Sequence, residues 1–494
     1  MQLHLAGWIH KGKLPSSLLA FVLVLCVSEV HCSGSVYQHV HLSASVASNE
    51  TLDCAKAYAV KDMPLYGGNA YGSVVHSYGP CFLNGRLSGQ RKNMSELAIE
   101  IMGKDEERIK ALVQRNHLAH DVERFLATSS ASSTFSETTS AVSYGVGNYI
   151  ANIGIGTPTE WFLLVLDTGS DLTWTQCVPC ETADSCYSQA NPIFDPSSSA
   201  SYTPIGCIRG CPACSTSGLC QYEQHYADNS GVRGDFAYET FTIGDARIQE
   251  YIFGCGRANQ GTFEGVDGLL GLGWGPLGMP SQTVSSFEGA FTYCLPSFLA
   301  SYTSTGFIEL GKGISEAASE GVLHTAMIKN TDLQSFYFVW LQGISVGSVP
   351  LALSSTSFSR PNSAAIAGTM TDCGTVITRL PAADYVTFRD AFIAGSSDIE
   401  LFRTSDFLDT CFRFNRKSQI PTVRFHFDGI DLSLPVENTV FPLSSNTACL
   451  AFAPMTFSWL QDVTIIGNYQ MQGFLFTFDT VGSTMGIQTA AKVC

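Results

Sequence analysis

Two copies of one short motif constrain this chain of 494 residues more than any other feature of its sequence. The first copy, Asp167–Ser170 (Asp-Thr-Gly-Ser), follows the apolar run Trp161–Leu166. About 100 residues later comes Leu269–Gly271 (Leu-Leu-Gly). The second copy, Asp372–Thr375 (Asp-Cys-Gly-Thr), is followed in the same way by Ile465–Gly467 (Ile-Ile-Gly). Two copies of one lobe would produce this order.

A single Asp-Thr-Gly is a weak signal, because Asp and Gly are common turn residues. Two copies at matching places in two halves are much stronger. Asp167 stands where a buried strand should end, and a carboxylate there needs hydrogen-bond partners. Gly169 and Gly374 supply tight turns whose backbone N–H groups can approach it. Ser170 and Thr375, three residues after each Asp, place hydroxyls within reach of the carboxylate oxygens.

The two motifs together predict acid–base chemistry if their loops meet across a pseudo-twofold axis. Two carboxylates that close cannot both ionise, so Asp167 and Asp372 would share a proton. The ionised member can take a proton from water, and the protonated member can polarise a carbonyl. This is hydrolysis without a covalent intermediate, and we expect neither a cofactor nor a metal.

The pattern of residues after Tyr144 predicts an all-β fold. Short apolar, aromatic and β-branched runs are broken by Gly, Pro, Asn and Ser, and long helical periodicity is scarce. Residues 94–126 differ, since they are charge-rich with apolar residues at helical spacing, which indicates an amphipathic helix. Residues 127–141 contain ten Ser or Thr in fifteen positions and read as a flexible linker.

The N-terminal third is predicted to contain a secretory signal peptide followed by a propeptide. Lys11 and Lys13, then the apolar run Leu18–Val27 and small residues, are typical of a secretory signal peptide over 1–32. We expect a propeptide over 33–141, an N-terminal lobe over 142–330 and a C-terminal lobe over 331–494. The apolar run is too short to span a membrane, so we expect no membrane anchor.

Charge is concentrated in the region expected to be the mature protein. Residues 1–141 hold 12 basic and 12 acidic residues, whereas 142–494 hold 15 basic and 31 acidic ones. This imbalance argues against nucleic-acid binding, which needs a basic face. The segment 84–126 has eight Lys or Arg. We expect its basic residues to lie across an acidic cleft and block it until acid releases them.

Cysteine usage indicates an oxidising compartment. Thirteen of the 17 Cys follow residue 142. Two Cys-x-x-Cys pairs leave zinc as an alternative, although their spacing is longer than in common zinc ribbons. If Cys373 is an unpaired thiol, an even number of disulfide candidates remains: Cys177, Cys180, Cys186, Cys207, Cys211, Cys214, Cys220, Cys255, Cys294, Cys411, Cys449 and Cys494.

Residues 148–494 resemble the pepsin-type aspartic proteases, in particular their plant nepenthesin-like branch. The resemblance rests on Asp167–Cys177, Phe253–Gly256, Gly268–Gly273, Thr375–Pro381 and Ile465–Asn468. It implies a bilobal β fold with a cleft for an extended peptide, with Asp167 and Asp372 as catalytic residues. The cysteine cluster over 177–220 resembles the disulfide-stapled insertion of that branch.

The same resemblance assigns supporting roles. Tyr226 falls at the place of the family's flap tyrosine, whose hydroxyl would reach the indole of Trp174. The family has Ser or Thr at position 373, where its hydroxyl and that of Thr168 lock the two loops together. Cys373 departs from this pattern, and a thiol is a poorer hydrogen-bonder. We therefore expect activity to be retained but lowered.

Two other motif matches point to different functions, but each lacks the structural context that its motif needs. Gly343–Gly347 (Gly-Ile-Ser-Val-Gly) matches the serine-hydrolase motif G-x-S-x-G, but that motif needs a strand-to-helix turn and an α/β sheet. Gly273–Gly278 matches a dinucleotide-binding pattern, but Pro276 interrupts it and no βαβ unit surrounds it.

The leading functional prediction is a secreted acid endopeptidase made as a zymogen, outside the cell or, alternatively, in a vacuole. Its partners would be an extended protein or peptide substrate and its own propeptide, and we expect a monomer. The alternative is a weakly active or inactive binding protein on the same fold, as in plant xylanase inhibitors, because fold does not decide function. A third reading is a silent or redox-sensing protein that uses Cys373.

Overall fold

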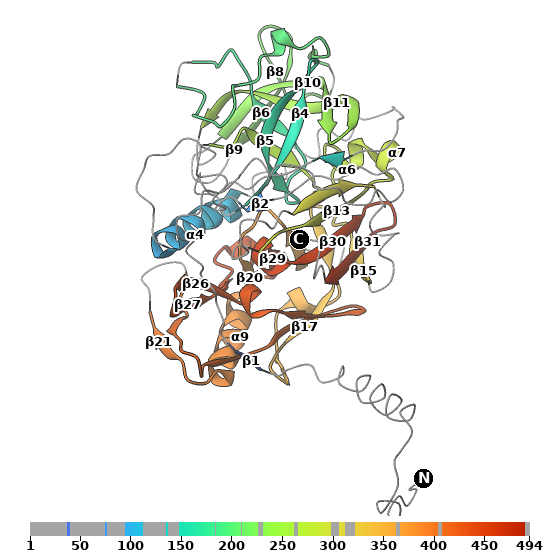
Figure 1. Cartoon of the computed structure of the whole chain (residues 1–494). Coiled ribbons are helices and arrows are strands. Elements are labelled where there is room, and N and C mark those ends of the chain that lie inside the picture. The colour runs from blue at the N-terminus through green and yellow to red at the C-terminus, as the bar shows by residue number, and fades with distance from the viewer. Residues whose placement is uncertain are drawn as a thin grey trace, which may run out of the picture.

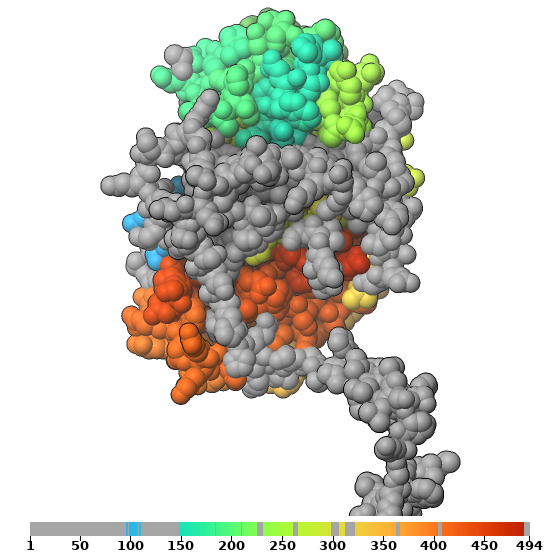
Figure 2. Space-filling model, viewed as in Figure 1, coloured from blue at the N-terminus to red at the C-terminus, as the bar shows by residue number. Residues whose placement is uncertain are grey.

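The computed structural model describes residues 37–39, 75–76, 94–111, 135–136 and 148–489, the last range with gaps at 183, 209, 226–230, 261–264, 298–305, 312–321, 362–365 and 404–407. Two β-rich lobes lie one above the other in Figure 1, the first coloured cyan to green and the second orange to red. Figure 2 shows the same two bodies as filled volumes. The all-β, bilobal prediction is confirmed.

The first lobe is built around one sheet with the strand order β2-β4-β5-β12-β6-β11-β10-β9-β8, and β7 pairs with β10. Its elements are β2 (Val75–His76), β4 (Tyr149–Ile155), β5 (Glu160–Asp167), β6 (Trp174–Gln176), η2 (Pro196–Ser198), β7 (Thr203–Pro204), β8 (Ala213–Cys214), β9 (Cys220–His225), β10 (Gly231–Ile243), β11 (Ala246–Gln260), β12 (Gly268–Gly271), α6 (Met279–Gln282) and α7 (Val284–Phe287).

A second sheet has the order β28-β20-β29-β19-β16-β15-β31-β30-β13-β14-β3. Its strands are β3 (Phe135–Ser136), β13 (Ala290–Cys294), β14 (Phe307–Leu310), β15 (Leu323–Ile328), β16 (Tyr337–Val339), β19 (Gly368–Asp372), β20 (Thr378–Leu380), β28 (Phe452–Pro454), β29 (Val463–Gly467), β30 (Phe474–Asp479) and β31 (Thr484–Thr489). Strands β13 and β14 therefore share a sheet with the C-terminal strands.

Smaller sheets complete the second lobe, in the orders β18-β17-β24-β25, β21-β22-β27-β26 and β1-β23. The remaining elements are β1 (Tyr37–His39), β17 (Leu341–Val346), β18 (Val349–Pro350), η3 (Thr356–Phe358), α9 (Ala382–Gly395), β21 (Glu400–Phe402), β22 (Cys411–Arg413), β23 (Gln419–Pro421), β24 (Val423–Phe427), β25 (Ile430–Leu434), η4 (Val436–Asn438), β26 (Val440–Ser444), β27 (Thr447–Leu450), η5 (Ser458–Leu460) and α10 (Asn468–Met471).

The sequence repeat corresponds to one strand pairing that occurs in each half. Strand β5 ends at Asp167, and β12 lies parallel to it with Gly271 opposite Asp167. Strand β19 ends at Asp372, and β29 lies parallel to it with Gly467 opposite Asp372. The Leu-Leu-Gly and Ile-Ile-Gly segments are therefore the neighbours of the two Asp-bearing strands.

Helix α4 (Met94–Ala111) lies at the boundary between the two lobes, where Figure 1 shows it in blue. Ala98, Ile101 and Met102 are buried in one apolar cluster with residues of the second lobe, among them Phe441. Ile109 is buried in another cluster with Phe336 and its neighbours. The helix predicted over 94–126 is confirmed for 94–111, and the rest of that prediction lies outside the described residues.

Candidate active site

The two aspartates lie at the ends of β5 and β19, and both are fully buried. Oδ1 of Asp167 accepts a hydrogen bond from Gly169 N at 2.8 Å, and its Oδ2 accepts one from Ser170 Oγ at 2.5 Å. The second half repeats the pattern: Asp372 accepts from Gly374 N at 2.9 Å and from Thr375 Oγ1 at 2.6 Å. The hydrogen bonds expected from each motif are confirmed.

The two carboxylates face each other across the lobe boundary. A Cβ at Gly169 would lie 2.9 Å from Oδ1 of Asp372, and one at Gly374 would lie 2.7 Å from Oδ1 of Asp167. Each glycine is thus required by the aspartate of the opposite motif, because a side chain there would overlap the carboxylate. This reciprocal close approach shows that the two motifs form one site.

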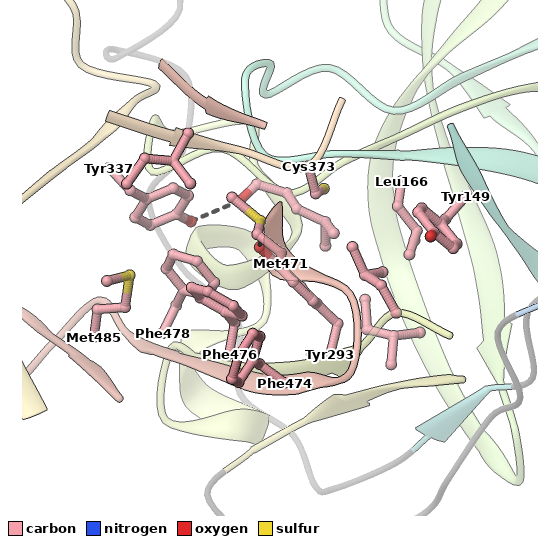
Figure 3. Packing of buried hydrophobic residues seen from close by; sticks show 14 of the residues in the cluster. Tyr149, Leu166, Tyr293, Tyr337, Cys373, Met471, Phe474, Phe476, Phe478 and Met485 are labelled. Carbon is pink, nitrogen blue, oxygen red and sulfur yellow. Dashed lines mark hydrogen bonds between the residues drawn. The ribbon is translucent and has the colours of Figure 1, made fainter. Parts of the chain in front are cut away.

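The loops are tied together at Thr168 and Cys373. Cys373 N donates to Thr168 Oγ1 at 2.9 Å, and Asn468 Nδ2 donates to Cys373 O at 3.0 Å. The thiol is free and buried, which confirms the prediction that Cys373 is unpaired. Figure 3 shows it within the apolar cluster that also contains Tyr337 and Leu166.

The thiol of Cys373 stays protonated over the range in which proteins function. Burial raises its pKa to about 12, the charge of Asp372 acts in the same direction, and hydrogen bonds with Thr168 oppose them. A neutral thiol adds no charge to the aspartate pair. It also offers weaker hydrogen bonding than the hydroxyl that the family resemblance led us to expect.

Helix α4 places the guanidinium of Arg108 on the two aspartates. Its Nη2 donates to Asp372 Oδ1 at 3.2 Å and Oδ2 at 3.1 Å, and it also contacts Asp167 Oδ1. Nη1 donates to Asp167 Oδ2 at 3.2 Å. Burial disfavours the charge on Arg108, but the two carboxylates outweigh it and raise the pKa of the guanidinium. The expected blocking role of basic residues thus has a specific candidate.

One turn earlier, α4 presents two carboxylates to Arg379 on β20. Arg379 Nη2 lies 3.0 Å from Asp105 Oδ2, and its Nη1 lies 2.6 Å from Glu106 Oε2. Asp105 Oδ1 also accepts from Val376 N at 2.5 Å, just after the second motif. Glu106 Oε1 accepts from Thr456 Oγ1 at 2.7 Å. The helix is therefore held by polar contacts as well as by its apolar face.

Two further predicted site residues are Trp174 and Tyr226. Trp174 is buried on β6 in a cluster with Tyr222 and Phe236. The predicted flap residue Tyr226 lies outside the described residues.

The cysteine cluster forms disulfides, so the zinc alternative is wrong. Four bonds involve it: Cys177–Cys255, Cys180–Cys186, Cys207–Cys214 and Cys211–Cys220. Cys411–Cys449 joins β22 to β27, and Cys294 is also disulfide-bonded. Cys494 lies outside the described residues. Within the described ranges, no group of three His, Cys, Asp or Glu side chains could hold a metal ion, and no helix is long and apolar enough to cross a membrane.

The G-x-S-x-G match has a partial triad around it. Ser345 Oγ lies 2.6 Å from His426 Nε2, and His426 Nδ1 lies 2.6 Å from Asp431 Oδ1. However, Ser345 is buried within β17, and the three residues lie on neighbouring antiparallel strands. The strand-to-helix turn that exposes a nucleophilic serine is absent at this place, so we assign these three residues no hydrolytic role.

The sequence did not single out Arg108, Asp105 or Glu106. The segment 84–126 has seven acidic residues beside its eight Lys or Arg, so charge alone could not rank them. The available signal was local: the run Asp105–Arg108 carries carboxylates and a guanidinium within one helical turn, next to the apolar Ile109.

Two β lobes that each contribute one aspartate to a shared buried pair define the pepsin-type aspartic protease class. The comparisons agree at the level of family. Residues 149–312 match the family model described as xylanase inhibitor N-terminal, and 336–489 match the one described as xylanase inhibitor C-terminal. The chain belongs to the plant, nepenthesin-like branch of this family.

Individual relatives support that placement. Aspartyl protease AED1 of Arabidopsis thaliana is 34% identical over 92% of this chain and 97% of its own length. Aspartic proteinase nepenthesin-1 of Nepenthes gracilis is 35% identical over 70% of this chain and 78% of its own. The crystal structure of edgp matches 70% of this chain and 94% of its own with a TM-score of 0.58 at 20% identity, which supports the fold.

Proposed function

We propose that this protein is a secreted aspartic endopeptidase that cleaves peptide bonds at acid pH and is made as an inactive precursor. The observation that carries the proposal is the aspartate pair. Asp167 and Asp372 are buried, each is held by the Gly N–H and the hydroxyl of its own motif, and each abuts the glycine of the other. Homologous plant proteins are named as aspartic proteases.

In the proposed mechanism, one aspartate is ionised and the other protonated, because two buried like charges cannot both persist. A water between them loses a proton to the ionised carboxylate as it attacks the peptide carbonyl. The protonated carboxyl hydrogen-bonds the carbonyl oxygen and stabilises the developing charge. The proton then passes to the leaving nitrogen, and the pair returns to its starting state.

Latency follows from α4 in this proposal. Nη2 of Arg108 contacts both carboxylates, so it occupies the place where a bridging water would have to act. Its positive charge also favours the doubly ionised pair, which cannot donate a proton to a carbonyl. We therefore propose that the segment containing α4 is the inhibitory part of a propeptide that is removed on activation.

The test is acid-dependent proteolysis by the purified full-length chain. We expect it to cleave an unfolded protein between about pH 2.5 and 5 after loss of the N-terminal segment, with activity falling towards neutrality. Asp167→Asn should abolish cleavage, since Asn cannot accept the proton. Asp428→Asn is the matched control, because Asp428 is exposed on the surface of the second lobe and should change nothing.

A second candidate is a binding protein on the same fold. It is favoured by the two matching family models, whose descriptions are those of a xylanase inhibitor. The intact aspartate pair favours the enzyme instead, because an inhibitor has no need of it. If the processed chain cleaves nothing across the acid range, binding to cell-wall glycosidases becomes the leading proposal.

A further inference from the structure

The strand that follows the second motif carries a buried cation beside the proposed catalytic pair. Arg379 lies on β20, opposite Ile465 of β29, and β29 runs beside the strand that ends at Asp372. The Arg379 side chain is 3% exposed with α4 in place. An arginine this buried needs a counter-charge, because an unpaired guanidinium is costly in a desolvated site.

All the ionic partners of Arg379 within the described ranges come from α4. Nη2 contacts Asp105 and Nη1 contacts Glu106, while Nε is buried without a hydrogen-bond partner in the part of the chain that the structure describes. The proposed mature region thus supplies a buried cation, and the proposed propeptide supplies its carboxylates. Removal of α4 would leave the guanidinium without either.

The spacing of residues on the same helix shows how close Arg379 lies to the aspartate pair. Asp105 and Glu106 precede Arg108 by three and two residues, which is about 3 to 4.5 Å along a helix axis. Arg108 contacts the aspartate pair, and Asp105 also takes the backbone N–H of Val376. Arg379 therefore lies close enough to be reached by a substrate side chain a few residues from the scissile bond.

We propose that Arg379 is a specificity-determining residue that binds an acidic side chain of the substrate, close to the bond that is cut. This inference rests on the proposed function. Arginine pairs with a carboxylate through two parallel hydrogen bonds, which neither an amide nor a hydroxyl reproduces. A substrate Asp or Glu would take over the contacts that Asp105 and Glu106 make in the precursor.

The test uses the full chain with a cleavage site for an unrelated protease placed in 127–141, so that α4 can be removed without self-processing. Peptides of one parent sequence carry Glu or Gln at each position within three residues of the scissile bond. They are assayed at about pH 5, where a free Glu, with a pKa of about 4.3, is mostly ionised. We expect Glu to exceed Gln in kcat/KM by about tenfold or more at one position, as for a charge-assisted hydrogen bond.

Variants assign that preference to the guanidinium. Arg379→Gln should reduce the Glu-to-Gln ratio to about one without abolishing cleavage of the Gln peptides, and Arg379→Lys should retain part of it. Arg413→Gln is the matched control, because Arg413 is an exposed arginine paired with Glu400 on the same lobe. If Arg379→Gln does not fold, the Arg379→Lys ratio decides. A wild-type ratio near one at every position, or a ratio unchanged in the Arg379 variants, overturns the inference.

A binding measurement separates this inference from the proposed function. The Asp167→Asn chain, with α4 removed in the same way, is titrated with the fluorescent Glu and Gln peptides. Tighter binding of the Glu peptide that depends on Arg379 supports the subsite even if no peptide is ever cut. Equal binding of the two peptides overturns the subsite even if the protein proves to be an active protease.

Discussion

At the scale of a single residue, Cys373 is the departure whose effect can be measured. Its backbone N–H still donates to Thr168, but its side chain is a neutral thiol with a pKa of about 12. We expect Cys373→Ser to raise turnover and the melting temperature, because a hydroxyl forms a stronger hydrogen bond across the two loops, worth about 1 kcal/mol. Turnover and thermal unfolding of the two proteins, measured in parallel, check this.

The opposite outcome would be informative as well. A less stable and less active Ser variant would mean that apolar packing of the thiol outweighs hydrogen bonding at this position. Alkylation provides an independent readout. At pH 8 a group with a pKa of about 12 is ionised in only about one molecule in ten thousand, so Cys373 should resist iodoacetamide until the chain unfolds.

At the scale of one element, α4 combines an apolar face with one functional cation. We expect Arg108→Met to leave the helix packed through Ile101, Met102 and Ile109 while removing its hold on the aspartate pair. Breaking a buried ion pair from one side costs about 3 to 5 kcal/mol, so the unprocessed precursor should become active at about pH 5, the upper end of the expected activity range. The measurement is cleavage by full-length protein before any processing.

Lys104→Met is the control on the same helix. Lys104 Nζ lies 3.8 Å from Glu100 Oε1 of the same helix. It should leave latency unchanged. If Arg108→Met is as latent as the wild type, then the bulk of the helix blocks the cleft and the charge of Arg108 does not matter.

The acid response of α4 has two opposing parts. The charges of Asp167 and Asp372 hold Arg108 and raise its pKa, and adding a proton to either carboxylate removes part of that attraction, so docking weakens as the pH falls. Burial raises the pKa of Asp105 against the pull of Arg379, so the docked state binds more protons at that group. Asp105 by itself makes docking tighter as the pH falls through its raised pKa.

Asp105→Asn removes only the second part, since Asn keeps an oxygen for Val376 N. We therefore expect release of the N-terminal segment to depend more steeply on pH in Asp105→Asn than in the wild type. Mass spectrometry of leader loss at a series of pH values gives both slopes. Equal slopes would show that Asp105 binds the same number of protons in the docked and the released states.

At the scale of the whole molecule, the sequence predicted what is local and repeated. The contacts of Asp167 with Gly169 and Ser170 span two and three residues, and the second motif repeats them, so the pattern carries the geometry. The pairing of Arg379 with Asp105 joins residues 274 apart and depends on how α4 packs between the lobes. No local pattern encodes such a contact, so the blocking segment could be predicted from the sequence but its key residue could not.

The order of strands in space does not follow the division into two halves. Strands β13 and β14 come before the middle of the folded region, yet β13 pairs with β30 near the C-terminus. The sheet of the C-terminal strands is thus completed by β13 and β14 from the first half of the chain, and a cut between the halves would leave β13 and β30 without each other. The sequence repeats one motif, but the pairing of β13 with β30 makes both halves of the chain parts of one sheet, so we expect neither half to fold when made separately.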